Sequence, residues 1–235
     1  MAAFSFKGGI HPYDGKDISK NKEIVDVIPT GEMVYPLQQH IGAMAKPVVK
    51  PGDRVLAYQK IAEAASFVSA NIFSSVSGVV KAIEPRRTAT GDKVMSIVID
   101  NDGLYEYADR IPVKPIADMT KEEVIAAVRE AGIVGMGGAG FPTHVKLSPK
   151  NPDKIYYVIA NCAECEPYLN GDHLTMLNFS EQLLKGIELV RIASGVDKAY
   201  YGIEVNKQDA IDKLNSLHPE KYGIEIVPEA VKSPQ

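Results

Sequence analysis

A run of glycines at residues 132–140 is the densest cluster of residues whose types could do chemistry. Five of these nine residues are glycine, and Lys146 follows six positions after the last of them. Glycines carry a large ordering entropy and bring no side chain to a core, so this density is favoured where a backbone approaches a flat ring or a phosphate. The loop could offer N–H groups to anionic oxygens, and Lys146 could add a positive charge.

Three other interpretations of the glycine run compete with this one. Gly135, Gly137 and Gly140 match the spacing of the dinucleotide-binding fingerprint, but that motif follows a strand and opens a helix. Here the run follows a predicted helix, and Pro142 comes two residues after the last glycine. A standard Rossmann turn is therefore disfavoured, and without a Gly-Lys-Ser/Thr step a P-loop is excluded. An ordinary helix-to-loop crossing with turn glycines stays open as the alternative.

A second chemically suggestive segment follows a predicted strand at residues 154–160. The chain continues with Asn161, Glu164 and Glu166 before Pro167. Ligands of open parallel sheets bind beyond the carboxyl ends of the strands, which is where these side chains are expected. An amide both donates and accepts, as recognition of a ribityl chain or a flavin edge requires. The alternative is a solvated loop that carries two surface acids.

The two cysteines of the chain, Cys162 and Cys165, lie in the same segment. Their spacing is that of a redox dithiol, but such thiols are activated at a helix N-terminus, and the next predicted helix opens only near Asp172. Two cysteines are too few for a thiolate-ligated iron–sulfur cluster, and no metal site is expected. A structural role for the pair is favoured.

The elements that must position these residues fall into two groups, and residues 31–115 are predicted to be all-β. Short apolar runs separated by Gly, Pro, Asn and Asp indicate a small barrel or sandwich. The Pro-bearing stretch at residues 110–118 resembles a linker, so two domains are expected, 1–115 and 116–235. The predicted strands in the first are Glu23–Ile28, Met33–Leu37, Arg54–Lys60, Gly78–Ile83 and Val94–Ile99.

The second predicted domain alternates helices and strands, which indicates an α/β fold with a largely parallel sheet. A capping box at Thr120 and Glu123 opens a helix that ends at Gly132. Longer helical patterns run from Asp172 to Gly195 and from Asn206 onwards. Three strands with both faces covered make a small sheet, so the domain is expected to be incomplete at its C-terminus. The predicted strands are 154–160, 198–205 and 222–227.

The composition of the chain argues against nucleic acid as a binding partner and against a membrane-spanning segment. The formal net charge is −4 and tryptophan is absent, so neither a basic field nor an aromatic platform for nucleic acid is expected. The longest apolar run is far shorter than the roughly 20 residues of a membrane span. The N-terminus is too short and polar for a signal peptide, which predicts folding in the cytoplasm.

The first predicted domain resembles the barrel-sandwich hybrid of biotinyl and lipoyl carrier domains. The matching parts are the Pro51-Gly52-Asp53 turn and the strand start at Ser77–Val80. Carrier domains present a modified lysine on a hairpin tip, and the corresponding stretch here, residues 63–74, contains no lysine. The fold is therefore expected without a swinging-arm function.

Taken in order, four segments resemble one family: Gly8–Pro12, the barrel-sandwich segment, Gly135–Lys146 and Asn161–Pro167. The chain looks like the N-terminal half of the C subunit of the Rnf electron-transport complex, a relative of the flavin subunit of respiratory complex I. The resemblance implies a peripheral protein on the cytoplasmic face of the membrane, bound to other subunits. It would oxidise NADH through FMN and pass electrons to 4Fe–4S clusters, which would lie in a C-terminal region that this chain lacks.

The same resemblance implies roles for individual residues. Asn161 and Glu164 would flank the flavin ring, and Lys146 would meet its ribityl or phosphate side. Phe141 and Glu166 would face the nicotinamide nucleotide, and no residue is expected to act as a catalytic acid or base. The glycines that would line FMN are Gly135, Gly137, Gly138 and Gly140.

Some positions depart from the complex I pattern, which has arginine where Met136 stands, aspartate where Ala163 stands and tryptophan where Leu147 stands. The missing regions suggest a fragment or a split gene product. Two other functions compete with the flavin subunit: a non-catalytic assembly scaffold that keeps the fold, and a soluble NADH-dependent dithiol oxidoreductase. In the leading interpretation the isolated chain is not competent for the full reaction.

Overall fold

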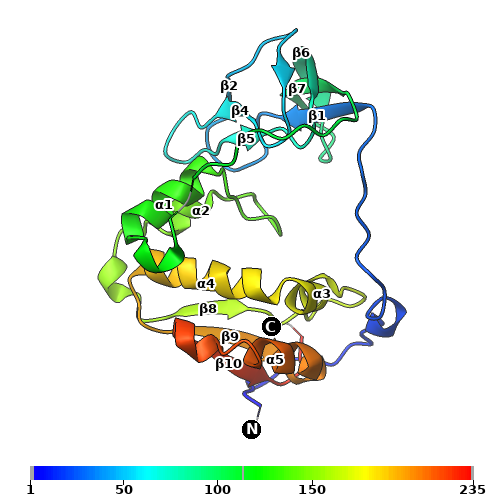
Figure 1. The fold of residues 1–235 in the computed structure, drawn as a ribbon. Helices are drawn as coiled ribbons and strands as arrows, with labels where there is room; N and C mark the ends of the chain where they lie inside the picture. The colour runs from blue at the N-terminus through cyan, green and yellow to red at the C-terminus, as the bar shows by residue number, and fades with distance from the viewer. Residues whose placement is uncertain (1–2, 113, 234–235) are drawn as a thin grey trace. The chain divides into compact units, whose positions relative to one another are not determined.

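The computed structural model describes residues 3–112 and 114–233, and its internal contacts divide the chain into two compact units (Figure 1). The barrel unit comprises Val27–Pro115 and Glu122–Lys150. The α/β unit comprises Met1–Asp26, Ile116–Lys121 and Asn151–Gln235. Each unit is thus assembled from separate stretches of chain, whereas the sequence predicts one boundary between residues 115 and 116.

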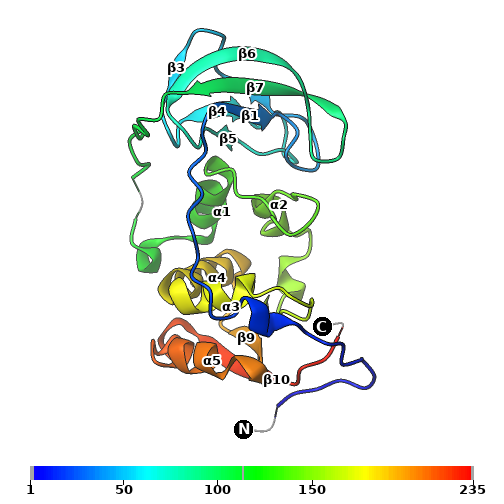
Figure 2. The same ribbon diagram turned by 90° about the vertical axis from the view of Figure 1, so that its right-hand side faces the viewer.

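The barrel unit contains two antiparallel sheets. One has the order β1-β7-β6-β3 and the other β2-β4-β5. The long strands β6 and β7 curve over the short strands of the unit (Figure 2). The strands are β1 (Glu32–Pro36), β2 (Lys46–Pro47), β3 (Arg54–Val55), β4 (Lys60–Glu63), β5 (Ile72–Phe73), β6 (Gly78–Arg87) and β7 (Lys93–Asn101).

Side chains of both sheets meet in one apolar core. Ile97 and Ile99 alternate along β7 and pack with Tyr35 of β1 and Ile61 of β4. This period of two is what places a strand's apolar residues on one face. The predicted strand Arg54–Lys60 is wrong in extent, because the chain turns at Tyr58, whose φ is +65°, and this separates β3 from β4. The predicted strand Glu23–Ile28 is also wrong, since this segment has no regular structure and its apolar side chains are exposed.

Two helices complete the barrel unit. Helix α1 (Lys121–Glu130) follows the predicted capping box and ends before Gly132, which has a positive φ of 65°. The short helix α2 (Thr143–Lys146) was not predicted. The glycine run therefore connects two helices, which agrees with the expectation that it does not form a standard Rossmann turn.

The α/β unit contains a parallel sheet of three strands, as the sequence predicts. The order is β10-β9-β8, with parallel pairing throughout. Its strands are β8 (Val158–Asn161), β9 (Ala199–Glu204) and β10 (Ile224–Glu229). Helices α3 (Gly171–Asn178) and α4 (Ser180–Ser194) connect β8 to β9, and α5 (Gln208–Asn215) precedes β10.

All three helices lie on the same face of this sheet. Each new strand is added on the same side of the previous one, so right-handed crossovers place every connecting helix on one face (Figure 2). Ala199, Tyr201 and Ile203 of β9 form the core with these helices. The opposite face carries exposed Tyr157 and Ile159, so the expectation of two covered faces is wrong for the described residues.

The long helix predicted from Asp172 to Gly195 is interrupted. Phe179 leaves the helical conformation, with φ −126° and ψ 32°, and separates α3 from α4. The predicted end is confirmed, because Gly195 adopts the left-handed conformation that closes a helix. The predicted start is wrong by two residues: Asn170 is the N-cap, and Asp172 lies in the first turn.

Among the described residues, no helix is both long and apolar enough to cross a membrane.

Candidate functional site

The glycine loop, residues 132–142, is closed at its base by backbone pairing. Val134 forms an isolated β-bridge with Pro142. The N–H of Gly135 donates to the carbonyl of Phe141 at 3.0 Å, and the N–H of Thr143 donates to the carbonyl of Ile133 at 2.9 Å. Beyond this base, the N–H groups of residues 136–140 have no hydrogen-bond acceptor among the described residues. Met136 at the tip is 96% exposed. The loop therefore presents a row of consecutive free donors.

The glycines of this loop serve two different purposes. Gly132 and Gly140 both have positive φ and lie against the barrel's own backbone. A Cβ at Gly132 would lie 2.3 Å from the carbonyl oxygen of Asn71, and one at Gly140 would lie 2.6 Å from that of Gln39. By contrast, a Cβ at Gly137 or Gly138 would meet no atom within 4 Å. Packing thus explains the outer glycines, and only the inner ones are free to let a ligand approach.

Lys146 lies beside the start of the loop. A Cβ at Gly135 would be 3.0 Å from the Lys146 Nζ, so the absence of a side chain there leaves room for the ammonium. Among the described residues, Lys146 has no hydrogen bond and no ion pair. A cation at the start of a loop whose next five N–H groups have no acceptor among the described residues is a suitable environment for a phosphate.

The hairpin of β4 and β5, residues 60–73, holds the glycine loop in place. Asn71 donates from Nδ2 to the carbonyl of Glu130 at 2.9 Å, and Lys60 forms an ion pair with the Glu130 side chain at 2.5 Å. His144 of α2 is 2% exposed and its Nε2 hydrogen-bonds the carbonyl of Phe67 at 2.7 Å. Both helices that flank the loop are therefore fixed to this hairpin.

In the α/β unit, the acidic loop is the segment Asn161–Asn170 that follows β8. Glu164 is buried, its backbone N–H donates to Oε2 of Glu204, and its Oε1 accepts from the N–H of Asp172 in the first turn of α3. Its Oε2 is buried without a hydrogen-bond partner among the described residues. Because an unpaired buried acceptor is costly, this oxygen is available to a donor from outside the chain.

Asn161 and Glu166 differ from Glu164 in exposure. The Asn161 side chain is exposed and its Oδ1 accepts from the N–H of Ala163 at 3.0 Å. The Glu166 side chain is exposed and has no partner among the described residues. The first orders the loop and leaves its own NH₂ group free, while the second offers an unpaired carboxylate.

Neither cysteine forms a disulfide. Burial raises the pKa of Cys162 to about 12, and the charges of Asp172 and Glu229 add to this effect. A redox thiol needs the opposite shift. The geometry therefore supports the structural interpretation of Cys162 over the dithiol hypothesis.

The structure adds an ion pair that the sequence analysis missed. Glu204, the last residue of β9, is buried beside Lys207, which donates to the same Oε2 that receives the Glu164 N–H. Glu204 could have been found, because it stands at the carboxyl end of a predicted strand. Lys207 carried no such signal, since it lies in a polar stretch that indicates only a helix start.

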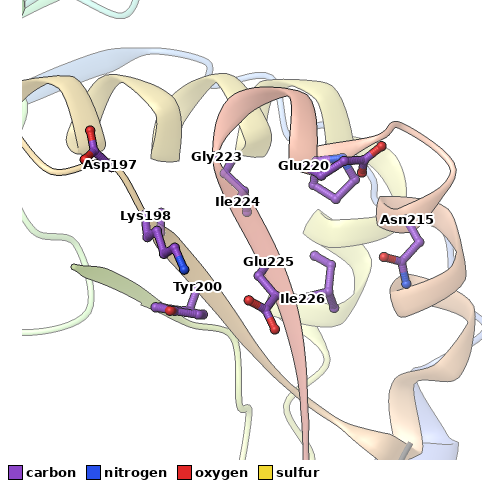
Figure 3. Close-up of a pocket in the computed structure, with 11 residues that line it drawn as sticks. Asp197, Lys198, Tyr200, Asn215, Glu220, Gly223, Ile224, Glu225 and Ile226 are labelled. Atoms are coloured by element: carbon purple, nitrogen blue, oxygen red, sulfur yellow. The ribbon is translucent and has the colours of Figure 1, made fainter.

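The predicted site residues divide between the two units. The barrel unit carries the four loop glycines, the half-buried Phe141 and Lys146, and the α/β unit carries Asn161, Glu164 and Glu166. An open hollow of about 490 Å³ also occurs in the α/β unit, lined by residues such as Lys198, Tyr200 and Glu225 (Figure 3). It lies at the amino ends of β9 and β10 and contains none of the predicted site residues.

Comparison with known proteins identifies two families in this order. Residues 4–104 match the RnfC barrel sandwich hybrid domain, and residues 128–235 match the Nuo51 FMN-binding domain. The chain is 42% identical over 233 residues to the C subunit of the proton-translocating ferredoxin:NAD(+) oxidoreductase complex of Clostridium ljungdahlii. It is also 42% identical over 238 residues to the C subunit of the Na(+)-translocating complex of Acetobacterium woodii.

These matches cover 98% of this chain but only 50% and 52% of the two relatives, so the chain spans about half of their length. Among solved structures, an NAD+-reducing NiFe-hydrogenase in the H2-reduced state is 27% identical, with a TM-score of 0.44. That similarity covers 50% of this chain and 22% of the hydrogenase chain.

Proposed function

Because the chain belongs to the RnfC family, we propose that it is a flavin-bearing part of an ion-translocating electron-transport complex that oxidises NADH. The two relatives are named as subunits of ferredoxin:NAD(+) oxidoreductase complexes. The proposal assigns FMN as the cofactor and NADH as the substrate. Iron–sulfur clusters would lie outside this chain, whose two cysteines cannot hold even one four-thiolate cluster.

One observation carries the flavin assignment: five consecutive N–H groups, those of residues 136–140, have no acceptor among the described residues, and the ammonium of Lys146 lies at Gly135, where this run begins. Runs of consecutive backbone N–H groups can bind phosphate and other anionic oxygens. The open space at Gly137 and Gly138 permits close approach of a flat or charged group. The residues present therefore fit a flavin mononucleotide, with its phosphate or ribityl side toward Lys146.

In the α/β unit, the acidic loop offers groups suited to recognising a flavin edge or a nucleotide. The Asn161 NH₂ group has no acceptor among the described residues, and Oε2 of Glu164, which has no hydrogen bond there, can accept from a polar edge of the flavin. The exposed carboxylate of Glu166 would bind the nicotinamide nucleotide.

In this proposal the protein binds and orients while the cofactor supplies the redox chemistry. A bound flavin accepts hydride from a nicotinamide and releases electrons singly, and the protein sets geometry and electrostatics. Lys146 would neutralise anionic charge, and the glycine loop would hold the ligand without side-chain contacts. Glu164, fixed by the N–H of Asp172, would keep its second oxygen in a constant direction. No residue is assigned a proton-transfer role.

The proposal also places the protein at the cytoplasmic face of the membrane, held there by other subunits of the complex. The dithiol alternative is disfavoured by the raised pKa of Cys162. The scaffold alternative predicts no flavin binding at all, so a binding measurement separates it from the proposal.

The test is a fluorescence titration of FMN into the protein and into Lys146→Gln. Charge-assisted hydrogen bonds contribute roughly 1.5–3 kcal/mol, so the variant should bind FMN at least about tenfold more weakly. The matched control is Lys150→Gln, which removes an exposed lysine four positions further on. Equal affinity of the two variants would contradict the role of Lys146, and no FMN binding by any form would favour the scaffold.

A further inference from the structure

The N-terminal latch, residues 14–19, contacts the acidic loop along most of its second half. Both segments belong to the α/β unit, although they lie about 150 positions apart in the chain. The latch falls within the match to the RnfC barrel sandwich hybrid domain, and the acidic loop within the match to the Nuo51 FMN-binding domain. An element of one family match therefore supports a loop of the other.

Lys16 is the centre of this contact. It is 8% exposed, and its Nζ donates to the carbonyls of Glu166 at 3.0 Å and Leu169 at 2.5 Å. The same Nζ forms an ion pair with Oε2 of Glu164 at 3.9 Å, too long for a hydrogen bond. A buried ammonium is costly unless it is paired and hydrogen-bonded, and among the described residues the acidic loop supplies every partner of this one.

Other latch residues accept hydrogen bonds from the acidic loop. Asn170 donates from Nδ2 to the carbonyl of Lys16 at 2.8 Å and to Ser19 Oγ at 2.9 Å. The N–H of Tyr168 donates to the carbonyl of Asp14 at 2.6 Å. Gly15 has a φ of +58°, and a Cβ there would lie 2.3 Å from the Tyr168 ring, so the close approach requires glycine.

We propose that Lys16 is a positioning residue of the candidate site. Its ammonium fixes the backbone at Glu166 and Leu169 and balances the charge of Glu164, and it thereby sets the direction of both carboxylates. The expected effect of Lys16 on NADH binding rests on the proposed function, whereas the expected effect of Lys16 on the order of the acidic loop does not. Lys16 touches neither flavin nor nicotinamide in this scheme, because it acts through the backbone of the loop.

The test compares Lys16→Met, which removes the charge, with Lys16→Arg, which keeps it. The matched control is Lys20→Met, because Lys20 is on the same segment, is exposed and pairs only with Asp17 among the described residues. Two readouts need no ligand: hydrogen–deuterium exchange of residues 164–172, and the rate at which iodoacetamide labels Cys165 inside the acidic loop. Mass spectrometry of peptides assigns both the exchange rate and the labelling rate to individual segments of the chain.

We expect Lys16→Met to raise both rates about tenfold while exchange in α4 and β9 stays unchanged, which is the pattern of local opening. Lys20→Met should match the parent protein, and Lys16→Arg should lie closer to the parent than Lys16→Met does. If Lys16→Met matches Lys20→Met in both readouts, the proposal is wrong.

A second variant covers the case in which Lys16→Met unfolds the whole unit. Ser19→Ala removes only a hydroxyl, which accepts from Asn170 and donates to the Tyr168 carbonyl at 3.4 Å. A smaller increase in exchange, confined to residues 164–172, supports the latch. No increase there, together with global unfolding of Lys16→Met, overturns it and makes Lys16 a general stability residue.

The third readout separates this inference from the proposed function. With FMN in excess and ferricyanide as acceptor, Lys16→Met should raise the KM for NADH about tenfold and change kcat less than about threefold. Faster exchange in the loop with an unchanged KM would support the latch and contradict the assignment of Glu166 to the nicotinamide nucleotide.

Discussion

At the scale of single residues, Glu164 and Glu166 lie two positions apart and occupy opposite environments. Glu164 is buried, with both its backbone N–H and Oε1 engaged, whereas the Glu166 carboxylate is exposed and without a partner among the described residues. The buried carboxylate is held by the N–H of Asp172 in α3 and by the ion pair with Lys16, and the exposed one is free to meet a ligand. Their functional contributions should therefore separate in kinetics.

Glu166→Gln tests the exposed carboxylate. In the proposed function this residue contacts the nicotinamide nucleotide equally in the ground and transition states, so the KM for NADH should rise about tenfold while kcat changes less than about threefold. Steady-state NADH oxidation with ferricyanide measures both constants. Glu181→Gln, an exposed glutamate on α4, is the control. A collapse of kcat at unchanged KM would give Glu166 a transition-state role instead.

Cys162 should be an inert thiol over the physiological pH range. Burial raises its pKa from 9.0 to about 12. At pH 9 the fraction of Cys162 present as thiolate should therefore be lower in the folded protein than in an unfolded chain by a factor on the order of 10² to 10³. Iodoacetamide labelling followed by mass spectrometry, from about pH 7 to about pH 10, measures the rate at this site. The same labelling in urea gives the unfolded reference.

The sign of the pH effect follows from the same shift. Because the folded pKa lies above the unfolded one, the stabilising contribution of the neutral thiol is complete below about pH 9 and is lost as the pH rises toward 12. Rapid labelling of Cys162 in the folded protein near pH 7 would contradict this and revive the dithiol hypothesis.

At the scale of elements, the glycine loop is anchored at its ends and open at its tip. Gly132 and Gly140 lie against the carbonyls of Asn71 and Gln39, and their positive φ fixes the direction of the chain. Gly137 and Gly138 have no neighbour that a Cβ would meet. Substitutions at the anchored glycines should therefore lower the stability of the fold, whereas substitutions at the open glycines should weaken ligand binding.

Gly140→Ala and Gly138→Ala are a matched pair for this difference. Gly140→Ala should lower the free energy of unfolding by about 1–3 kcal/mol, because φ is +61° and the new Cβ meets the Gln39 carbonyl. Gly138→Ala should change that free energy by less than about 0.5 kcal/mol and should weaken FMN binding. Urea unfolding and FMN titration of both variants are the measurements. Equal loss of stability in the two would show that the tip is also packed.

At the scale of the whole molecule, each unit has its own apolar core and its own set of predicted site residues. The barrel core is built around Tyr35, Ile61, Ile97 and Ile99, and the α/β core around β9 and its three helices. Residues 136–139, whose N–H groups have no acceptor among the described residues, lie at the exposed tip of the glycine loop. The loop therefore offers a ligand anchoring donors but little apolar enclosure.

The chain of 235 residues should therefore fold but hold FMN weakly. A tight ligand of this size usually buries 70–90% of its surface, and an exposed loop tip provides less. After incubation with FMN and gel filtration, the flavin content measured by absorbance should be well below one per chain. The longer relative from Acetobacterium woodii, about half of which this chain covers, is the comparison. Stoichiometric FMN on the 235-residue chain would show that its own residues complete the pocket.

Local patterns were enough for the sequence to determine the two fold classes, the parallel strands and the end of α4 at Gly195. These features depend on patterns that span only a few residues: the alternation of apolar residues in a strand, the apolar period of a helix and the glycine that ends it. Such patterns can be recognised in the sequence without a tertiary structure. The glycine run and the acidic segment were found for the same reason, since their residue types lie side by side in the chain.

Only the tertiary structure decided what depends on contacts between distant segments. It separated the packing glycines from the open ones, because Asn71 and Gln39 lie far from the loop in sequence. It buried Glu164 beside Glu204, left one face of the sheet open, and brought Lys16 to the acidic loop. Burial and charge pairing arise from residues 40 to 150 positions apart, and no local pattern encodes which of them will meet.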